Sequence, residues 1–380
     1  MHWLAPDSSA RALHERARSV LAPLQPTPAA VPWIAAARGA WLRDVDGERC
    51  LDLAANDGTL LHGHAHPLIN AAVADQLERG CCTGLPGEAE VALAELLCGR
   101  VPSFERIRLC ASEDAALRCL RDILRSLSDR NEILHVDNDP ALGSEPVCRA
   151  IDDAGPGLGA VLVDPAPPRH GFCIRDVDDL AAIERCARGR GALVVLDERR
   201  AFRLGFAGAQ GRFGASPDLT LLGAQIGGGW TTSALAGLEQ HMVLPAAADR
   251  AVHPDPLSMA AGHASLTLLD LTAFERLDAL GAELRARIAG ILEASALPLT
   301  VSGVGSAFAL RDVRQVRGEL EDEGAPLIDS LYRVMLSRGV LLNPDGTGYL
   351  TTTIGAAELD HCIDALERSV DEIATSDSGA

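Results

Sequence analysis

Chemistry in this chain cannot run through a lysine amine, because none of its 380 residues is lysine and its 34 lysine-or-arginine residues are all arginine. An arginine guanidinium is delocalised and stays protonated, so it cannot replace an amine in forming a Schiff base. Asp197, Arg199 and Arg200 directly follow an apolar run. Their spacing indicates either an anion-binding site or a structural ion pair between an arginine and Asp197 or its neighbour Glu198.

Two further motifs have the composition of ligand sites. His62, His64 and His66 alternate, and histidines on one face of a strand can bind a metal ion. The glycine triplet at 227–229 lacks the spacing and the lysine of a P-loop, so it indicates close backbone approach in a turn. Trp230 follows this triplet and is expected to line a pocket or an interface. The sequence supports no Ser-His-Asp or Cys-His arrangement.

The composition limits the class of protein and its partners. A net charge of −19 disfavours nucleic acid and anionic membranes, which repel an acidic surface. The hydrophobic share of 47% is typical of a globular protein. The first ten residues show no signal peptide and no apolar stretch is long enough to span a bilayer. Ten cysteines without a framework spacing predict reduced thiols. We therefore expect a cytoplasmic protein, and the abundance of Ala, Arg and Leu suggests a bacterial one.

The elements that must position these residues alternate between strand and helix. An Asp46-Gly47 step between two apolar runs predicts a tight hairpin. Short apolar strands are expected at 107–110, 132–136, 160–163, 192–196 and 219–222, with helices at 115–127 and 177–188 between them. This alternation predicts an α/β fold with a mostly parallel sheet covered by helices. One long helix or two consecutive helices are expected at 256–297, and a last helix at 357–373.

Several segments resemble class III aminotransferases, and within that class glutamate-1-semialdehyde 2,1-aminomutase. They are the hairpin at 40–53, Gly63-His-Ala-His-Pro67, and the segments 88–98, 101–105, 207–219, 226–229 and 256–262. The resemblance implies a fold type I pyridoxal-phosphate (PLP) architecture and a dimer with active sites at the subunit interface. It implies a large α/β domain at 45–255, a small α+β domain formed mainly by 256–380, and an N-terminal segment, 1–44, that joins the small domain. The family keeps a similar Gly-His-x-His-Pro turn without metal, so we expect no metal.

The resemblance also implies where PLP contacts would lie. The Schiff-base lysine position, three residues before the glycine triplet, is Ala224, so no catalytic residue is assigned. Asp197 keeps the carboxylate that faces the pyridine nitrogen in the family, and Arg199 replaces a small apolar residue. The remaining positions of this vestigial pocket are Ser112, Glu113, Asp139 and Ala251, and further candidates for a ligand contact or pocket wall are Arg200, Trp230 and His253. Because these contacts differ from those of the family, no cofactor is expected.

Three functions follow from this interpretation. The first is a non-catalytic partner or regulatory homologue, which forms a homodimer or a heteromer with an active homologue or a biosynthetic enzyme. The second is an enzyme repurposed for PLP-independent chemistry in a specialised biosynthetic pathway. The third is residual aminotransferase or aminomutase activity with noncovalent PLP. Without a cofactor, no pyridinium balances the charge of Asp197, and an unpaired buried carboxylate lowers the stability of the fold. Asp197 is therefore predicted to pair with Arg199 or Arg200, and Glu113 to find a basic or donor partner or to face solvent.

Overall fold

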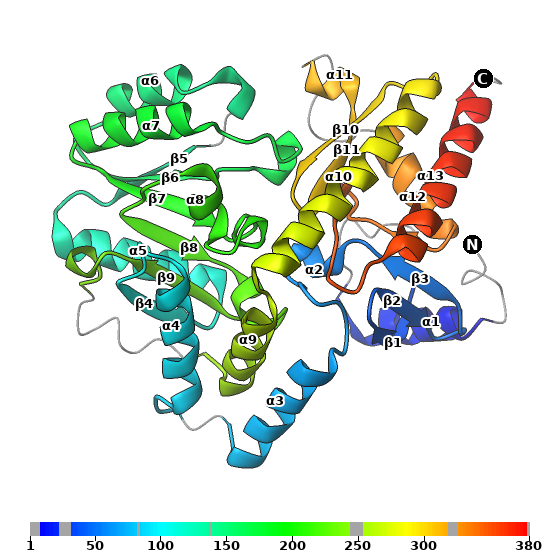
Figure 1. Cartoon of the computed structure of the whole chain (residues 1–380), viewed down its shortest axis with the longest axis horizontal. Helices are drawn as coiled ribbons and strands as arrows, with labels where there is room; N and C mark the ends of the chain where they lie inside the picture. The colour runs from blue at the N-terminus through cyan, green and yellow to red at the C-terminus, as the bar shows by residue number, and fades with distance from the viewer. Residues whose placement is uncertain are drawn as a thin grey trace.

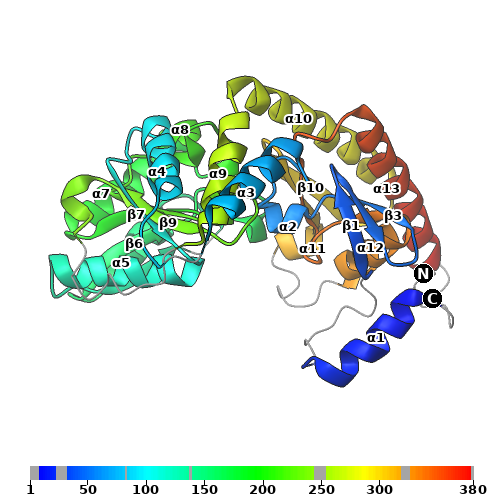
Figure 2. The same ribbon diagram turned by 90° about the horizontal axis from the view of Figure 1, so that it is seen from below.

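Two lobes lie side by side in the computed structural model of the chain, as Figures 1 and 2 show. The structure describes residues 8–22, 32–81, 84–136, 139–243, 254–317 and 326–377. One lobe is built on a six-stranded sheet, and the other holds two smaller sheets together with the first and last helices. In the described part of the chain no helix has both the length and the apolar character that a membrane crossing requires.

The large sheet is mostly parallel. Its strands, in spatial order, are β4 (Arg106–Cys110), β9 (Ser233–Gly237), β8 (Leu219–Leu222), β7 (Leu193–Glu198), β6 (Leu158–Val163) and β5 (Glu132–Val136). The neighbours from β5 to β8 pair in parallel, whereas β9 runs antiparallel to both β8 and β4. Every residue of β6 is buried, as expected for a strand covered on both faces. The expected α/β fold class is confirmed.

Helices cover both faces of this sheet because successive strand residues point to opposite sides. Leu162 and Val195 belong to the cluster that packs against α5 (Glu113–Leu127). Val161 and Val194, one position away, belong to the cluster of α6 (Glu145–Asp153) and α7 (Val177–Gly189). The two faces therefore have separate cores.

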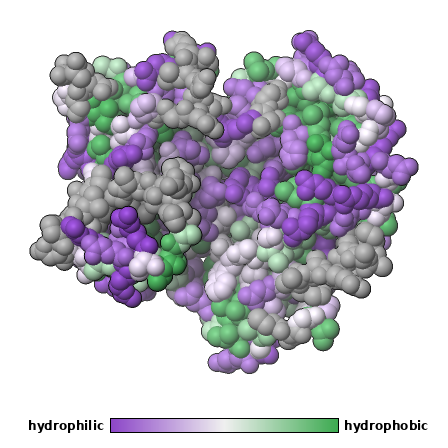
Figure 3. All heavy atoms as spheres, turned by 180° about the vertical axis from the view of Figure 1, so that it is seen from behind, coloured by the Kyte–Doolittle hydropathy of each residue, from purple (hydrophilic) through white to green (hydrophobic). Residues whose placement is uncertain are grey.

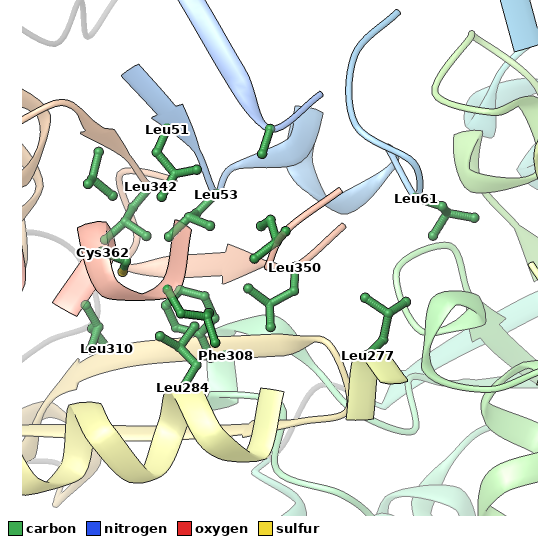
Figure 4. Close-up of a cluster of buried hydrophobic side chains, with 14 of the residues drawn as sticks. Leu51, Leu53, Leu61, Leu277, Leu284, Phe308, Leu310, Leu342, Leu350 and Cys362 are labelled. Atoms are coloured by element: carbon green, nitrogen blue, oxygen red, sulfur yellow. The ribbon is translucent and has the colours of Figure 1, made fainter. Parts of the chain in front are cut away.

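The smaller lobe combines the two ends of the chain. One sheet has the order β1 (Ile34–Arg38), β2 (Trp41–Asp44), β3 (Arg49–Asp52) and β12 (Val340–Leu341), and the other β10 (Leu299–Val304), β11 (Ala307–Asp312) and β13 (Thr347–Tyr349). Its helices are α1 (Ser9–Val20), α10 (Leu271–Ala294), α11 (Val313–Val316), α12 (Pro326–Ser337) and α13 (Ala356–Asp377). Figure 4 shows their shared core, in which Leu53, Leu284 and Phe308 meet from the N-terminal sheet, α10 and β11.

The remaining helices connect the lobes or cover their edges. They are α2 (Ala55–Gly58), α3 (Pro67–Arg79), α4 (Glu88–Arg100), α8 (Gly208–Phe213) and α9 (Pro256–Leu268). Figures 1 and 2 both place α2 between the lobes. Helix α3 projects from the body, and Figure 3 shows hydrophobic surface on this projecting end among hydrophilic residues. Leu68 and Leu77 of α3 are each 58% exposed.

The structure agrees with most predicted elements and corrects some. The hairpin at Asp46-Gly47 joins β2 and β3, which pair antiparallel. The helical stretch after residue 256 is two helices, α9 and α10, because Asp270 interrupts it and caps α10 by accepting a hydrogen bond from the Ala273 amide at 2.8 Å. The sequence did not predict β9, an apolar strand of small residues, or α6. Reduced thiols were expected throughout, but Cys148 and Cys186 form a disulfide that joins α6 to α7.

Candidate functional site

Asp197 lies near the carboxyl end of β7 and is held by Arg199, two residues further along the chain. The Arg199 guanidinium donates from Nε to Oδ1 at 2.8 Å and from Nη2 to Oδ2 at 2.6 Å. The Arg199 backbone N–H also donates to Oδ1, at 3.1 Å. Two parallel hydrogen bonds of this kind are the strong geometry for a guanidinium and a carboxylate. The predicted pairing of Asp197 with Arg199 is confirmed.

Glu113 receives contacts from two guanidiniums at the start of α5. Its Oε1 lies 2.9 Å from Nη1 of Arg200, and its Oε2 lies 3.3 Å from Nη1 of Arg199. The preceding residue, Ser112, caps the helix by accepting a hydrogen bond from the Ala115 amide at 3.2 Å. A carboxylate in the first turn is also stabilised by the helix dipole. The prediction that Glu113 finds a basic partner is therefore confirmed.

Arg200 continues these contacts to α2. It donates from Nε to Oδ2 of Asp57 at 2.8 Å, and its Nη2 lies 2.7 Å from the same oxygen. The backbone at Asp57 is unusual, because Ala55, Asn56 and Asp57 have consecutive positive φ angles of 48°, 51° and 55°. Such conformations in non-glycine residues cost free energy and cluster at functional sites. We call the five residues Asp197, Arg199, Glu113, Arg200 and Asp57 the ion-pair chain.

Burial changes the proton affinity of the carboxylates near the ion-pair chain. Asp164 directly follows β6, and its Oδ1 accepts a hydrogen bond from the Ala166 amide at 2.9 Å. Burial, with the nearby Asp197 carboxylate, raises the pKa of Asp164 to about 7. Burial also raises the pKa of Asp57, although Arg200 opposes that shift. The hydrogen bonds to Asp197 raise the pKa of the Arg199 guanidinium, which therefore stays charged.

We expect Asp164→Asn to make the protein more stable than the wild type at pH 8 and equally stable near pH 4. The pKa of Asp164 is about 7 in the folded protein, against about 3.9 for an unfolded aspartate. Between these values the native state binds more protons, so wild-type stability falls as the pH rises. The charges of Arg175 and Arg199 oppose the shift and are already included in that pKa. Because one pKa unit corresponds to about 1.4 kcal/mol, a shift of about three units makes the gain at pH 8 up to about 4 kcal/mol.

Urea unfolding of both proteins at several pH values measures this gain. The groups that act on the Asp164 carboxyl besides those two arginines are Asp197 and the Ala166 amide. Parallel stability curves for the wild type and the variant between pH 4 and 8 would contradict the prediction.

The other predicted pocket residues are distributed around the ion-pair chain. Ala224 begins the short 3-10 helix η5 (Ala224–Gly227). A Cβ atom on the preceding residue, Gly223, would lie 2.7 Å from Oε1 of Glu113, so Ala224 follows directly on the contact with that carboxylate. Trp230 is 43% exposed beyond the glycine turn. Asp139 makes different contacts: it accepts a hydrogen bond from the Ala141 amide at 2.9 Å and lies 3.9 Å from His170. Ala251 and His253 lie outside the described residues.

Two histidines of the motif, His62 and His64, contact residues from other segments of the chain. The two ring nitrogens of His62 lie 2.8 Å from the Thr352 hydroxyl and from the Ser265 carbonyl. His64 contacts Asp52 at 2.7 Å. Among the described residues no group of three potential metal ligands comes together.

Two residues that matter at the site were not predicted from the sequence. Asp57 lies in a segment where no periodicity indicates a charged contact. Asp164 did carry a signal, since it directly follows an apolar strand next to the strand of Asp197. Neighbouring parallel strands end at the same edge of a sheet, so the two aspartates could have been placed together.

Comparison with known proteins identifies relatives along almost the whole chain. A glutamate-1-semialdehyde 2,1-aminomutase of Opitutus terrae is 29% identical, covering 90% of this chain and 92% of that protein. Among solved structures, an omega-transaminase from Sphaerobacter thermophilus is 29% identical with a TM-score of 0.87, covering 97% of this chain and 99% of that one. The expected fold type I architecture and the expected resemblance to the aminomutases are confirmed.

The expectation of no cofactor was wrong, because known relatives point to PLP or pyridoxamine phosphate (PMP). One similar structure is a transaminase with PLP bound, 26% identical with a TM-score of 0.85, covering 97% of this chain and 98% of that one. Another is a lysine-to-alanine variant of the glutamate-1-semialdehyde aminomutase of Pseudomonas aeruginosa in complex with PMP. It is 21% identical with a TM-score of 0.84, covering 96% of this chain and 94% of that one. The expectation treated altered contacts as lost binding, whereas the latter protein holds its ligand after a lysine is replaced.

The family model for class III aminotransferases covers nearly all the elements described above. It matches residues 26–137 and 122–370, which include the large sheet, the ion-pair chain and most of the smaller lobe. The chain therefore belongs to the class III aminotransferase family.

Proposed function

We propose that this chain is a non-catalytic member of its family that serves as a partner or regulatory homologue. The observation that carries the proposal is the absence of lysine from the entire chain. Schiff-base catalysis on a carbonyl group needs a primary amine that can lose its proton, and guanidinium groups do not supply one. The residue at the lysine position of the family, as the resemblance aligns it, is Ala224.

The ion-pair chain supports the same proposal. Arg199 donates two side-chain hydrogen bonds to the Asp197 carboxylate and balances its charge. This carboxylate therefore does not need a cationic group from a ligand. Had both arginines pointed away from Asp197, a repurposed active site would have been the better interpretation. Instead, Arg199 pairs with Asp197, and both arginines contact Glu113. These contacts favour the non-catalytic function over the repurposed one.

PLP and PMP are the ligands to which the family points, and a chain without lysine can hold either one only noncovalently. When bound, such a cofactor supplies an aldehyde or an amine on an electron-withdrawing ring. The side chains do not fit it in their present arrangement, because the Glu113 carboxylate lies between the two guanidiniums that would meet its phosphate. Because Arg199 already pairs with Asp197, a ligand bound in this arrangement would not contact Asp197 through its ring nitrogen.

We also propose that the chain forms a homodimer by itself. In its role as a partner or regulatory homologue it forms a heteromer with an active homologue. The exposed leucines of the projecting α3, Leu68 and Leu77, support an interface there. Exposed apolar surface of this kind marks interaction sites in soluble proteins.

One set of measurements on the purified protein tests these proposals. With PLP and an amino donor, we expect no transamination and, after borohydride reduction, no PLP adduct other than on the α-amino group. Light scattering should give twice the chain mass of 39.9 kDa. Turnover above that of a heat-denatured sample, or a PLP adduct within the folded chain, would refute the non-catalytic function. A monomer at micromolar concentration would refute the dimer.

A further inference from the structure

The ion-pair chain contains one more carboxylate than it has guanidiniums. Asp197 has its own cation in Arg199, and Asp57 has its own in Arg200, each through Nε and Nη2. Glu113 takes only the remaining nitrogen, Nη1, of each arginine. Glu113 is therefore the carboxylate without a cation of its own.

The Glu113 carboxylate occupies a position that suits an anion from outside the chain. Two guanidinium nitrogens contact it, at 2.9 Å and 3.3 Å. Gly223 allows its close approach, because any Cβ there would lie 2.7 Å from the Glu113 oxygen. The side chain is only 30% exposed. A charge-assisted contact in such a place is stronger than one at a free surface.

The same contacts connect the two lobes. Arg200 belongs to the lobe of the large sheet, whereas Asp57 belongs to α2, which lies between the lobes. Two of the contacts that hold α2 in its left-handed conformation are the Arg200–Asp57 ion pair and the hydrogen bond from Asn56 Nδ2 to the Thr59 hydroxyl at 2.8 Å. Displacing Glu113 would free Arg200 Nη1 without breaking this connection.

We propose that Glu113 is an autoinhibitory residue, an internal anion that closes the site of Arg199 and Arg200 against a phosphate monoester. The inference rests on the proposed function, since it concerns how the same site is regulated. A phosphate monoester such as PMP binds when Glu113 leaves, and each arginine then keeps its own carboxylate while Nη1 contacts the ligand. The charges of the ion-pair chain explain why Glu113 opposes binding. With Glu113 in place the ion-pair chain has a net charge of −1, and without it the two remaining carboxylates and the two guanidiniums balance.

The test is the affinity for PMP of the full chain, measured by titration calorimetry on the wild type and on Glu113→Gln. Glutamine has the same size as glutamate and lacks the charge, so we expect it to bind PMP about tenfold more tightly, the effect of removing one like-charge contact at a partly buried site. Asp278→Asn is the matched control, because Asp278 also pairs with an arginine, Arg212 at 2.7 Å, but in α10. It should bind PMP as the wild type does.

A second variant, Glu113→Ala, guards against a folding defect specific to glutamine, and should show the same gain. Equal PMP affinity in the wild type and both Glu113 variants, or no binding in any of them, would overturn the inference. Failure of the proposed function looks different: it is transamination by the wild type, whatever the affinity ratio.

Discussion

Replacing Arg203 with methionine is expected to lower the free energy of unfolding by about 3–5 kcal/mol, because three buried acceptors lose their donor at about 1–3 kcal/mol each. Arg203 follows β7 by a few residues and is 2% exposed. Its guanidinium donates to the Gly58 and Leu350 carbonyls, each at 2.5 Å, and to the Ser306 hydroxyl at 3.1 Å. Methionine fills similar space but leaves these buried acceptors without a donor.

The burial of Arg203 has a visible cost in the wild type. No carboxylate is among these hydrogen-bond partners, and burial lowers the pKa of the guanidinium to about 10. Its carbon atom Cζ lies 4.8 Å from the ring centre of Tyr349, a cation–π contact. Arg203 therefore connects the large sheet to α2 and to the C-terminal segment through hydrogen bonds and ring contact, rather than through an ion pair.

Chemical denaturation of Arg203→Met and of Arg333→Met measures the difference. Arg333 is the control because it also makes a polar contact, an ion pair with Asp329 at 2.9 Å, but there both side chains are about half exposed. Exposed pairs of this spacing contribute roughly 0.3–0.5 kcal/mol. An equal loss of unfolding free energy in the two variants would show that Arg203 does not hold the large sheet, α2 and the C-terminal segment together.

Much of the fold could be predicted from the sequence because several of its strands are short apolar runs. The strand at 132–136 and the strand at 219–222 were predicted with the bounds that the structure has. Strand β9 was missed because Ser233-Ala-Leu-Ala-Gly237 is rich in small residues, which have weak strand preference. Its burial between β4 and β8 comes from tertiary packing, which no local pattern expresses.

The site was only partly accessible. The pairing of Asp197 with Arg199 could be predicted because the two residues are neighbours in sequence and an unpaired buried carboxylate is costly. The contact of Arg200 with Asp57 joins residues 143 positions apart and depends on how the lobes meet. The left-handed backbone of α2 was also unforeseen, because Ala55-Asn56-Asp57 contains no glycine.

Supplying the missing amine alone is expected to be insufficient. We predict that Ala224→Lys, mixed with PLP and reduced with borohydride, gains little covalent adduct in intact mass measurements, whereas Ala224→Lys combined with Glu113→Gln gains about tenfold more. Only an unprotonated amine attacks an aldehyde. Residue 224 directly follows Gly223, which lies against Glu113, so an ammonium there can pair with the surplus carboxylate of the ion-pair chain.

The size of the effect follows from that charge. An opposite charge within 4–6 Å shifts a pKa by about 1–3 units towards the charged form, so Glu113 should reduce the unprotonated fraction of the new amine by about tenfold or more. In the double variant Asp197 and Asp57 are balanced by Arg199 and Arg200, and the ammonium has no surplus carboxylate to hold it. Ala224→Lys with Asp278→Asn is the matched control and should behave as the single variant. Equal adduct in all three proteins would mean that the absent lysine, and not Glu113, is the whole obstacle to covalent attachment.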